Sequence, residues 1–113
     1  PVVLVGASTG GEAVVAANAK APDGVIDGTV ALSPAGGTRY AERLQGRLLF
    51  VASDGDERRF VTNARRLHRG ATEPKRVKLY PGDAHGQGLF DSRHAGDIRK
   101  RTTRVIALAC DGE

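Results

Sequence analysis

The first eleven residues contain a serine whose surroundings favour nucleophilic chemistry. The sequence PVVLVGASTGG places Ser8 in a G-x-S-x-G pattern, between Gly6 and Gly10, directly after an apolar run. A serine on a tight turn between a strand and a helix projects its hydroxyl out of the sheet, and flanking glycines tolerate the strained backbone. The amide of Thr9, at the start of the following helix, would point to where an oxyanion forms. The pattern predicts a nucleophile at Ser8 and an oxyanion-binding amide at Thr9.

The other residue types that acyl transfer needs occur after later apolar segments. Asp54 and Asp56 follow one such segment, and His85 lies in a glycine-rich loop after another. Loops that follow the strands of a parallel sheet open at one edge, so residues far apart in sequence meet there. The serine would attack a carbonyl, the imidazole would carry the proton to the leaving group, and a carboxylate would orient the imidazole. The order serine, acid, histidine is that of α/β-hydrolases.

Each of these residues also has a purely structural interpretation. Ser8 could belong to an ordinary strand–helix turn, and His85 could be a loop histidine bonded to its neighbours. Asp56 could cap the helix expected to begin near Glu57. One aspartate rarely serves as both a helix cap and a triad acid, so Asp54 stays open as the alternative acid.

The segments that must position these residues alternate between strands and helices. Apolar runs predict strands at Val2–Val5, Thr29–Leu32, Leu48–Ala52 and Arg76–Tyr80. Helical spacing predicts helices at Gly11–Lys20, Thr38–Leu44, Glu57–Arg69 and His94–Ala109. The first strand is apolar throughout, as in a strand covered on both faces, and the last helix is expected to turn Ile98, Val105, Ile106 and Ala109 inward. This alternation predicts an α/β fold: a four-stranded parallel sheet with right-handed crossovers in a three-layer α/β/α unit.

Four segments of the chain resemble the C-terminal half of the α/β-hydrolase family, especially its small capless or dienelactone-hydrolase-like members. VVLVGASTGG resembles the nucleophile strand and turn, GTVALSP the next strand, LLFVASDGDERRFVTNARRL the acid-bearing strand and its helix, and KLYPGDAHGQGLF the last strand and histidine loop. The resemblance implies Ser8 as nucleophile and His85 as base, and favours Asp56 over Asp54 as the acid. It also implies a small-molecule carboxylic ester or related acyl bond as substrate, an acyl-enzyme intermediate, and neither a metal nor an organic cofactor.

The resemblance begins at the nucleophile strand. The strands and the second oxyanion loop that precede it in the family have no counterpart in these 113 residues. We therefore expect a single, partial domain over residues 1–113, with the outer edge of Val2–Val5 unpaired. Such an edge would favour a homo-oligomer or the missing N-terminal half as partner. Whether the chain is active alone stays open.

The composition is that of an ordinary globular protein, with 40% hydrophobic and 27% charged residues. A single cysteine, Cys110, excludes a disulfide within the chain and is compatible with the cytoplasm, which we expect as the location. No apolar run reaches the length of a membrane span, so no membrane partner is expected. The net charge of +4 raises the question of nucleic acid, but only 4% of residues are aromatic, too few for base-stacking platforms. We interpret the basic clusters as solvated helix faces and expect no nucleic-acid partner.

Three other functions stay open at this point. A non-catalytic interaction module fits the missing half and the basic helices. Gly6 to Gly10 also matches part of a dinucleotide-binding fingerprint, but Glu12 stands where a glycine is required and would repel a pyrophosphate. GASTGG also resembles the start of the chemotaxis methylesterase catalytic domain. That family places its histidine after the second strand, where this chain has Leu32-Ser33-Pro34.

Overall fold

A sheet of four parallel strands lies at the centre of the molecule in the computed structural model, which describes residues 1–111. The strands are β1 (Val3–Ala7), β2 (Gly28–Leu32), β3 (Arg47–Ser53) and β4 (Lys75–Tyr80), and they lie side by side in chain order. In the register of the sheet, Ala7 lies opposite Leu32 and Ser53 opposite Tyr80, so the carboxyl ends of the strands meet at one edge. The predicted α/β fold with a four-stranded parallel sheet is confirmed.

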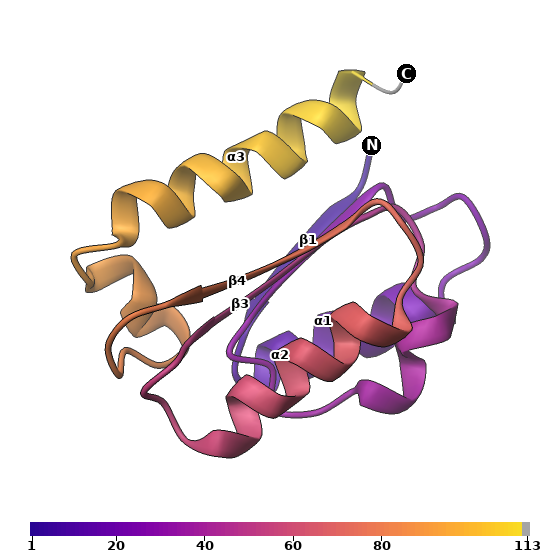
Figure 1. The fold of residues 1–113 in the computed structure, drawn as a ribbon. Helices are drawn as coiled ribbons and strands as arrows, with labels where there is room; N and C mark the ends of the chain where they lie inside the picture. Colours follow the sequence, from indigo (N-terminus) through magenta and orange to yellow (C-terminus); the bar gives the residue numbers. More distant parts are fainter. Residues whose placement is uncertain (112–113) are drawn as a thin grey trace.

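Helices cover both faces of this sheet (Figure 1). Helices α1 (Thr9–Lys20) and α2 (Arg58–Gly70) lie on one face, with the 3-10 helix η1 (Thr38–Arg43) beside them. Helix α3 (Ala95–Asp111) crosses the other face, preceded by the 3-10 helix η2 (Gly86–Asp91). The three predicted layers are therefore present. The structure differs from the prediction of a helix at Thr38–Leu44, since Thr38–Arg43 form a 3-10 helix. It also differs at η2, where two glycines give the sequence the composition of a loop.

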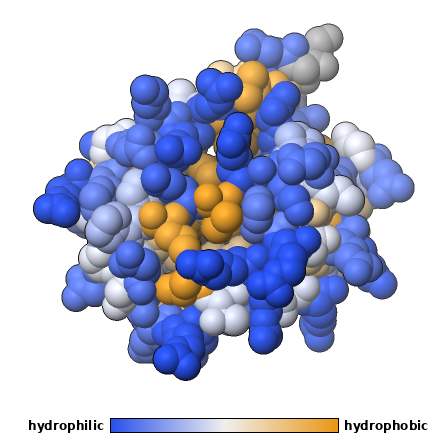
Figure 2. Space-filling view, viewed as in Figure 1, coloured by the Kyte–Doolittle hydropathy of each residue, from blue (hydrophilic) through white to orange (hydrophobic). Residues whose placement is uncertain are grey.

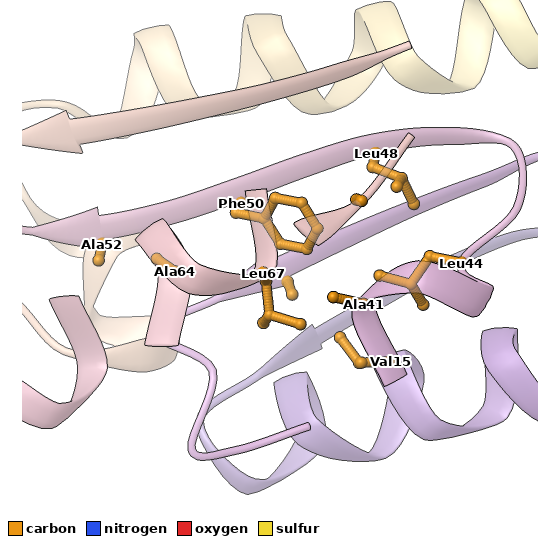
Figure 3. Close-up of a cluster of buried hydrophobic side chains, with 10 residues drawn as sticks. Val15, Ala41, Leu44, Leu48, Phe50, Ala52, Ala64 and Leu67 are labelled. Atoms are coloured by element: carbon orange, nitrogen blue, oxygen red, sulfur yellow. The ribbon is translucent and has the colours of Figure 1, made fainter. Parts of the chain in front are cut away.

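The central strands are buried on both sides because their side chains alternate between two cores. Leu48 and Phe50 of β3 point towards α1 and α2, where they pack with residues such as Leu67 (Figure 3). Leu49 and Val51 of the same strand point towards α3 and pack in the second core. Successive residues of a strand face opposite sides, so a strand between two helical layers is apolar throughout.

Phe50 is the largest fully buried side chain of the molecule's described part, with no exposed surface. We expect Phe50→Ala to lower the free energy of unfolding by about 3–5 kcal/mol, because it removes buried apolar area and leaves a cavity. Urea unfolding followed by circular dichroism measures this change. Ile106→Ala, at a side chain that is 41% exposed, is the control and should change stability by no more than about 0.5 kcal/mol. Equal losses in the two variants would contradict this account of the core.

Two burial expectations are wrong. The first strand is not covered on both faces, since Val5 is 46% exposed. Strand β1 lies at the edge of the sheet and has β2 as its one neighbour among the described strands. Ile106 does not face inward, because Val105 and Ala109, four residues apart, set the buried side of α3 and leave Ile106 turned away.

Most of the surface on the side seen in Figure 2 is hydrophilic, and the hydrophobic side chains that show there gather between the two helical layers. None of the helices within residues 1–111 combines the length and apolar character needed to cross a bilayer.

Candidate catalytic site

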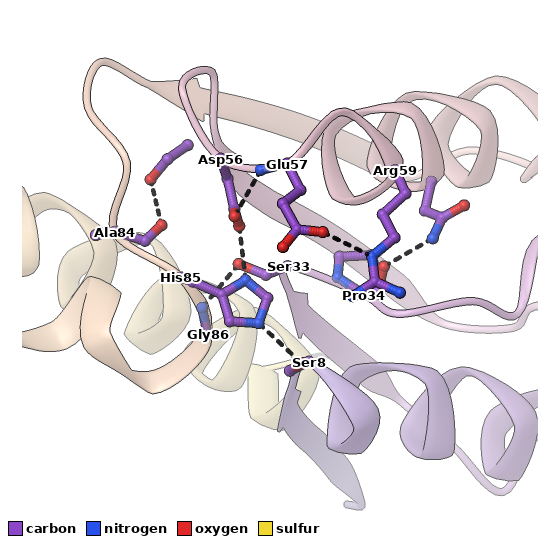
Figure 4. Close-up of polar contacts among 11 residues, drawn as sticks. Ser8, Ser33, Pro34, Asp56, Glu57, Arg59, Ala84, His85 and Gly86 are labelled. Atoms are coloured by element: carbon purple, nitrogen blue, oxygen red, sulfur yellow. Dashed lines mark hydrogen bonds and ion pairs between the residues drawn. The ribbon is translucent and has the colours of Figure 1, made fainter.

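Three side chains from three loops meet at the carboxyl edge of the sheet (Figure 4). The Nε2 atom of His85 lies 2.9 Å from the Oγ atom of Ser8, and its Nδ1 atom lies 2.6 Å from Oδ2 of Asp56. Ser8 follows β1, Asp56 follows β3 and His85 follows β4. The structure thus brings together the serine, the imidazole and the favoured carboxylate in one hydrogen-bonded row.

The chemistry of the three groups sets the direction of the two hydrogen bonds. An ionised carboxylate only accepts, so Nδ1 of His85 carries the proton in the bond to Asp56. In the neutral imidazole the other nitrogen, Nε2, is then an acceptor, and the Ser8 hydroxyl donates to it. The Asp56 side chain is 8% exposed, whereas that of His85 is 37% exposed. The carboxylate is therefore shielded from water while the imidazole stays accessible.

The turn that carries Ser8 has the strained backbone expected of it. Ser8 has φ 56° and ψ −115°, a conformation that costs a non-glycine residue about 1–3 kcal/mol. Its amide donates to the Leu32 carbonyl at 2.8 Å, and its carbonyl accepts from the Ala35 amide at 3.1 Å. A side chain at Gly6 would collide with the Gly10 carbonyl oxygen. The turn is therefore fixed from both sides, and glycine at position 6 is a steric requirement.

Asp56, rather than Asp54, reaches the imidazole. The Asp54 side chain is exposed, and the amide of this residue donates to the Tyr80 carbonyl at 2.8 Å. The next amide, of Gly55, donates to the Gly82 carbonyl at 2.8 Å, so the acid loop runs alongside the histidine loop. Asp56 is not the N-cap of α2, which is Glu57, but its other carboxylate oxygen, Oδ1, accepts from the Glu57 amide at 2.7 Å.

Phe60 is a neighbour of the imidazole that the sequence alone did not single out. Its ring centroid lies 4.2 Å from that of His85, with the two planes at 53°. Phe60 is buried on α2 and forms a wall behind the imidazole, which limits the orientations of the ring. The residue fits the helical apolar pattern of α2, so its sequence indicates a core position and nothing more. No sequence pattern links Phe60 to the imidazole, because Asp56 lies before the start of α2.

The Thr9 amide lies directly after the serine, as the first residue of α1. The first amides of a helix have no acceptor within the helix and carry a partial positive charge. The N–H group of Thr9 can therefore donate a hydrogen bond to a group bound beside the Ser8 hydroxyl. Within residues 1–111, no group of three or more His, Cys, Asp or Glu side chains is arranged to hold a metal ion.

The architecture and the position of this row place the chain among proteins with an α/β-hydrolase-like fold. The structure is similar to that of a protein from Thermoplasma acidophilum described as a predicted CIB-like hydrolase, with a TM-score of 0.73 and 21% sequence identity. The match covers 95% of this chain and 50% of that protein, so the chain spans half the length of its structural neighbour. At this identity the likeness shows the fold. No family model matches the sequence, and no curated protein matches it either.

Proposed function

We propose that this chain is a serine hydrolase domain that cleaves a carboxylic ester or related acyl bond through an acyl-enzyme intermediate. The observation that carries the proposal is the row Ser8–His85–Asp56, with contacts of 2.9 and 2.6 Å. A hydrolase-like fold agrees with this function and adds no information about the substrate.

The proposed reaction has two stages. His85 Nε2 accepts the proton of Ser8 as Oγ attacks the carbonyl carbon, and the Thr9 amide donates to the oxyanion that forms. Asp56 stabilises the imidazolium, which then gives its proton to the leaving alcohol. In the second stage His85 takes a proton from a water molecule as the water attacks the acyl carbonyl. The bond from the acyl carbon to Ser8 Oγ then breaks, the imidazolium returns the proton to Oγ, and the carboxylic acid leaves. The chemistry uses no metal or organic cofactor.

Labelling by a fluorophosphonate probe tests this proposal, because such probes react with serine hydroxyls that a neighbouring base activates. The folded chain should be labelled at Ser8, which mass spectrometry of the digested protein identifies. A folded chain that takes up no probe would favour the alternative of an interaction module without catalysis.

The free edge of β1 supports a further part of the proposal, association with a second copy of the chain. The two edge strands differ in character: β4 carries Lys75, Arg76 and Lys78, whereas β1 has the sequence VLVGA. Charged residues protect an edge strand from pairing with other chains, and β1 has none. Two β1 edges related by a two-fold axis would extend both sheets.

We expect the chain to form a dimer that Val5→Lys disrupts, because the substitution puts a charge into the paired edge. Sedimentation velocity over a range of protein concentrations measures this. Thr72→Lys, an exposed position before the opposite edge strand, adds the same charge and should leave the dimer intact. A monomeric wild-type chain, or equal dissociation of both variants, would contradict the model.

A further inference from the structure

The backbone is hydrogen-bonded to a buried serine on each side of His85. The Ser53 hydroxyl donates to the carbonyl of Ala84 at 2.6 Å, and the amide of Gly86 donates to the Ser33 hydroxyl oxygen at 2.9 Å. Ala84 and Gly86 are the two residues that flank His85 in the chain. Ser33 and Ser53 are 0% and 1% exposed, so neither hydroxyl exchanges freely with water. Figure 4 shows the Gly86–Ser33 contact close to the imidazole, and a second contact at Ala84.

The position of these serines follows from the sheet. Ser8 comes directly after β1, Ser33 directly after β2, and Ser53 is the last residue of β3. Three neighbouring strands therefore each deliver one serine to the same edge. The first contacts the imidazole itself, and the other two contact the backbone on either side of it.

Ser33, which makes one of these contacts, has an unusual backbone conformation. Its φ is 47°, and Ser8 and Ser33 are the two non-glycine residues with positive φ in the part of the chain that the structure describes. A non-glycine residue persists in this region only where its surroundings hold it there, and such residues cluster at functional sites. The Ser33 amide donates to the Val51 carbonyl at 2.7 Å, which fixes the residue between β2 and β3.

We propose that Ser33 and Ser53 are positioning residues, which hold the histidine loop so that the His85 ring spans Ser8 and Asp56. This inference rests on the proposed function. The loop before η2 contains Gly82, and η2 begins at Gly86, which has φ 60°; glycines adopt many backbone conformations, so these two positions do little to hold His85 in place. The two serine hydroxyls restrict it from the strands below, and Phe60 restricts the ring from the side. A displacement of about 1 Å in a catalytic group can cost on the order of 100-fold in rate.

Removal of either hydroxyl should therefore slow the reaction of Ser8 while the chain stays folded. We expect Ser33→Ala and Ser53→Ala each to reduce the second-order rate constant for fluorophosphonate labelling by about 10- to 100-fold. Ser92→Ala is the matched control: its hydroxyl donates to the Leu89 carbonyl at 2.7 Å and accepts from the His94 amide at 3.2 Å, so it bonds to neither residue that flanks His85. Its loss should change the rate less than about 2-fold. A cooperative urea-unfolding transition is required of each variant, so that only folded variants are compared.

Two further variants separate the hydroxyl from the backbone strain. Ser33→Gly removes the hydroxyl and also relieves the cost of a positive φ, so it should fold at least as well as Ser33→Ala and react as slowly. Ser53→Thr keeps the hydroxyl and should recover most of the lost rate. Wild-type rates in folded Ser33→Ala and Ser53→Ala, or in Ser33→Gly, would overturn the proposal.

A spectroscopic measurement tests the positions of the groups without catalysis. The proton between His85 Nδ1 and Asp56 is held in a short hydrogen bond and should give a resolved low-field proton resonance in wild type and in Ser92→Ala. We expect this resonance to broaden in Ser33→Ala and Ser53→Ala as the loop moves and the proton exchanges faster. A wild-type chain that shows the resonance but takes no probe would count against the proposed function alone. An unchanged resonance in both variants would count against the positioning role.

Discussion

Ser8→Ala is expected to abolish fluorophosphonate labelling of the chain and to lower the hydrolysis of a small activated ester by at least about 1000-fold. The reason is that Oγ of Ser8 is the atom to which the acyl or phosphonyl group becomes attached, and the bond cannot form without it. The substitution should leave the fold intact, because the hydrogen bonds that fix the turn come from the Ser8 backbone and are retained. Labelling is measured on a gel with a fluorescent probe, and hydrolysis by release of a coloured alcohol.

The control for this experiment is Ser92→Ala, which removes a serine hydroxyl outside the row and should leave both signals unchanged. Circular dichroism and urea unfolding should show that the Ser8→Ala chain keeps its secondary structure and its stability to within about 1 kcal/mol. Labelling that persists in Ser8→Ala would assign the reactive group to another residue. A wild-type chain that is folded, dimeric and unlabelled would favour an interaction module.

The α/β fold could be predicted from the sequence because its signals are local. The segment LLFVA is apolar at every position, which is typical of a strand between two helical layers, and β3 lies there. Exposure could not be predicted in the same way. Whether Val5 is covered depends on what lies beside β1, and a run of apolar residues contains no information about the neighbours of the strand.

The three polar residues of the site were also predictable, although their catalytic role stays a prediction. Ser8 lies between glycines whose spacing has a steric meaning, and His85 and Asp56 follow strands whose ends meet at one edge. Ser33 and Ser53 were not predictable, because a serine at the end of a strand is common in turns. Their contacts arise from the approach of the histidine loop to β2 and β3, which no short pattern in the sequence describes.

Asp56→Asn should lower the labelling and hydrolysis rates by about 10,000-fold while the chain stays folded. The carboxylate accepts a hydrogen bond from Nδ1–H of His85, which keeps the proton on Nδ1 and leaves Nε2 free to accept from Ser8. An asparagine amide at the same position can donate to Nδ1, which places the imidazole proton on Nε2. That nitrogen then cannot take the serine proton, and the imidazolium loses the charge that would stabilise it.

Asp54→Asn is the matched control, since it makes the same change two residues away at an exposed side chain. We expect it to change the rates less than about 2-fold, because the Asp54 carboxylate lies outside the row and its amide, which bonds to Tyr80, is retained. Stopped-flow measurement of fast labelling and gel-based measurement of slow labelling together cover the range of rates expected for the two variants. A larger loss in Asp54→Asn than in Asp56→Asn would assign the acid role to Asp54 instead. The order of the two losses therefore decides which carboxylate orients the imidazole during the reaction.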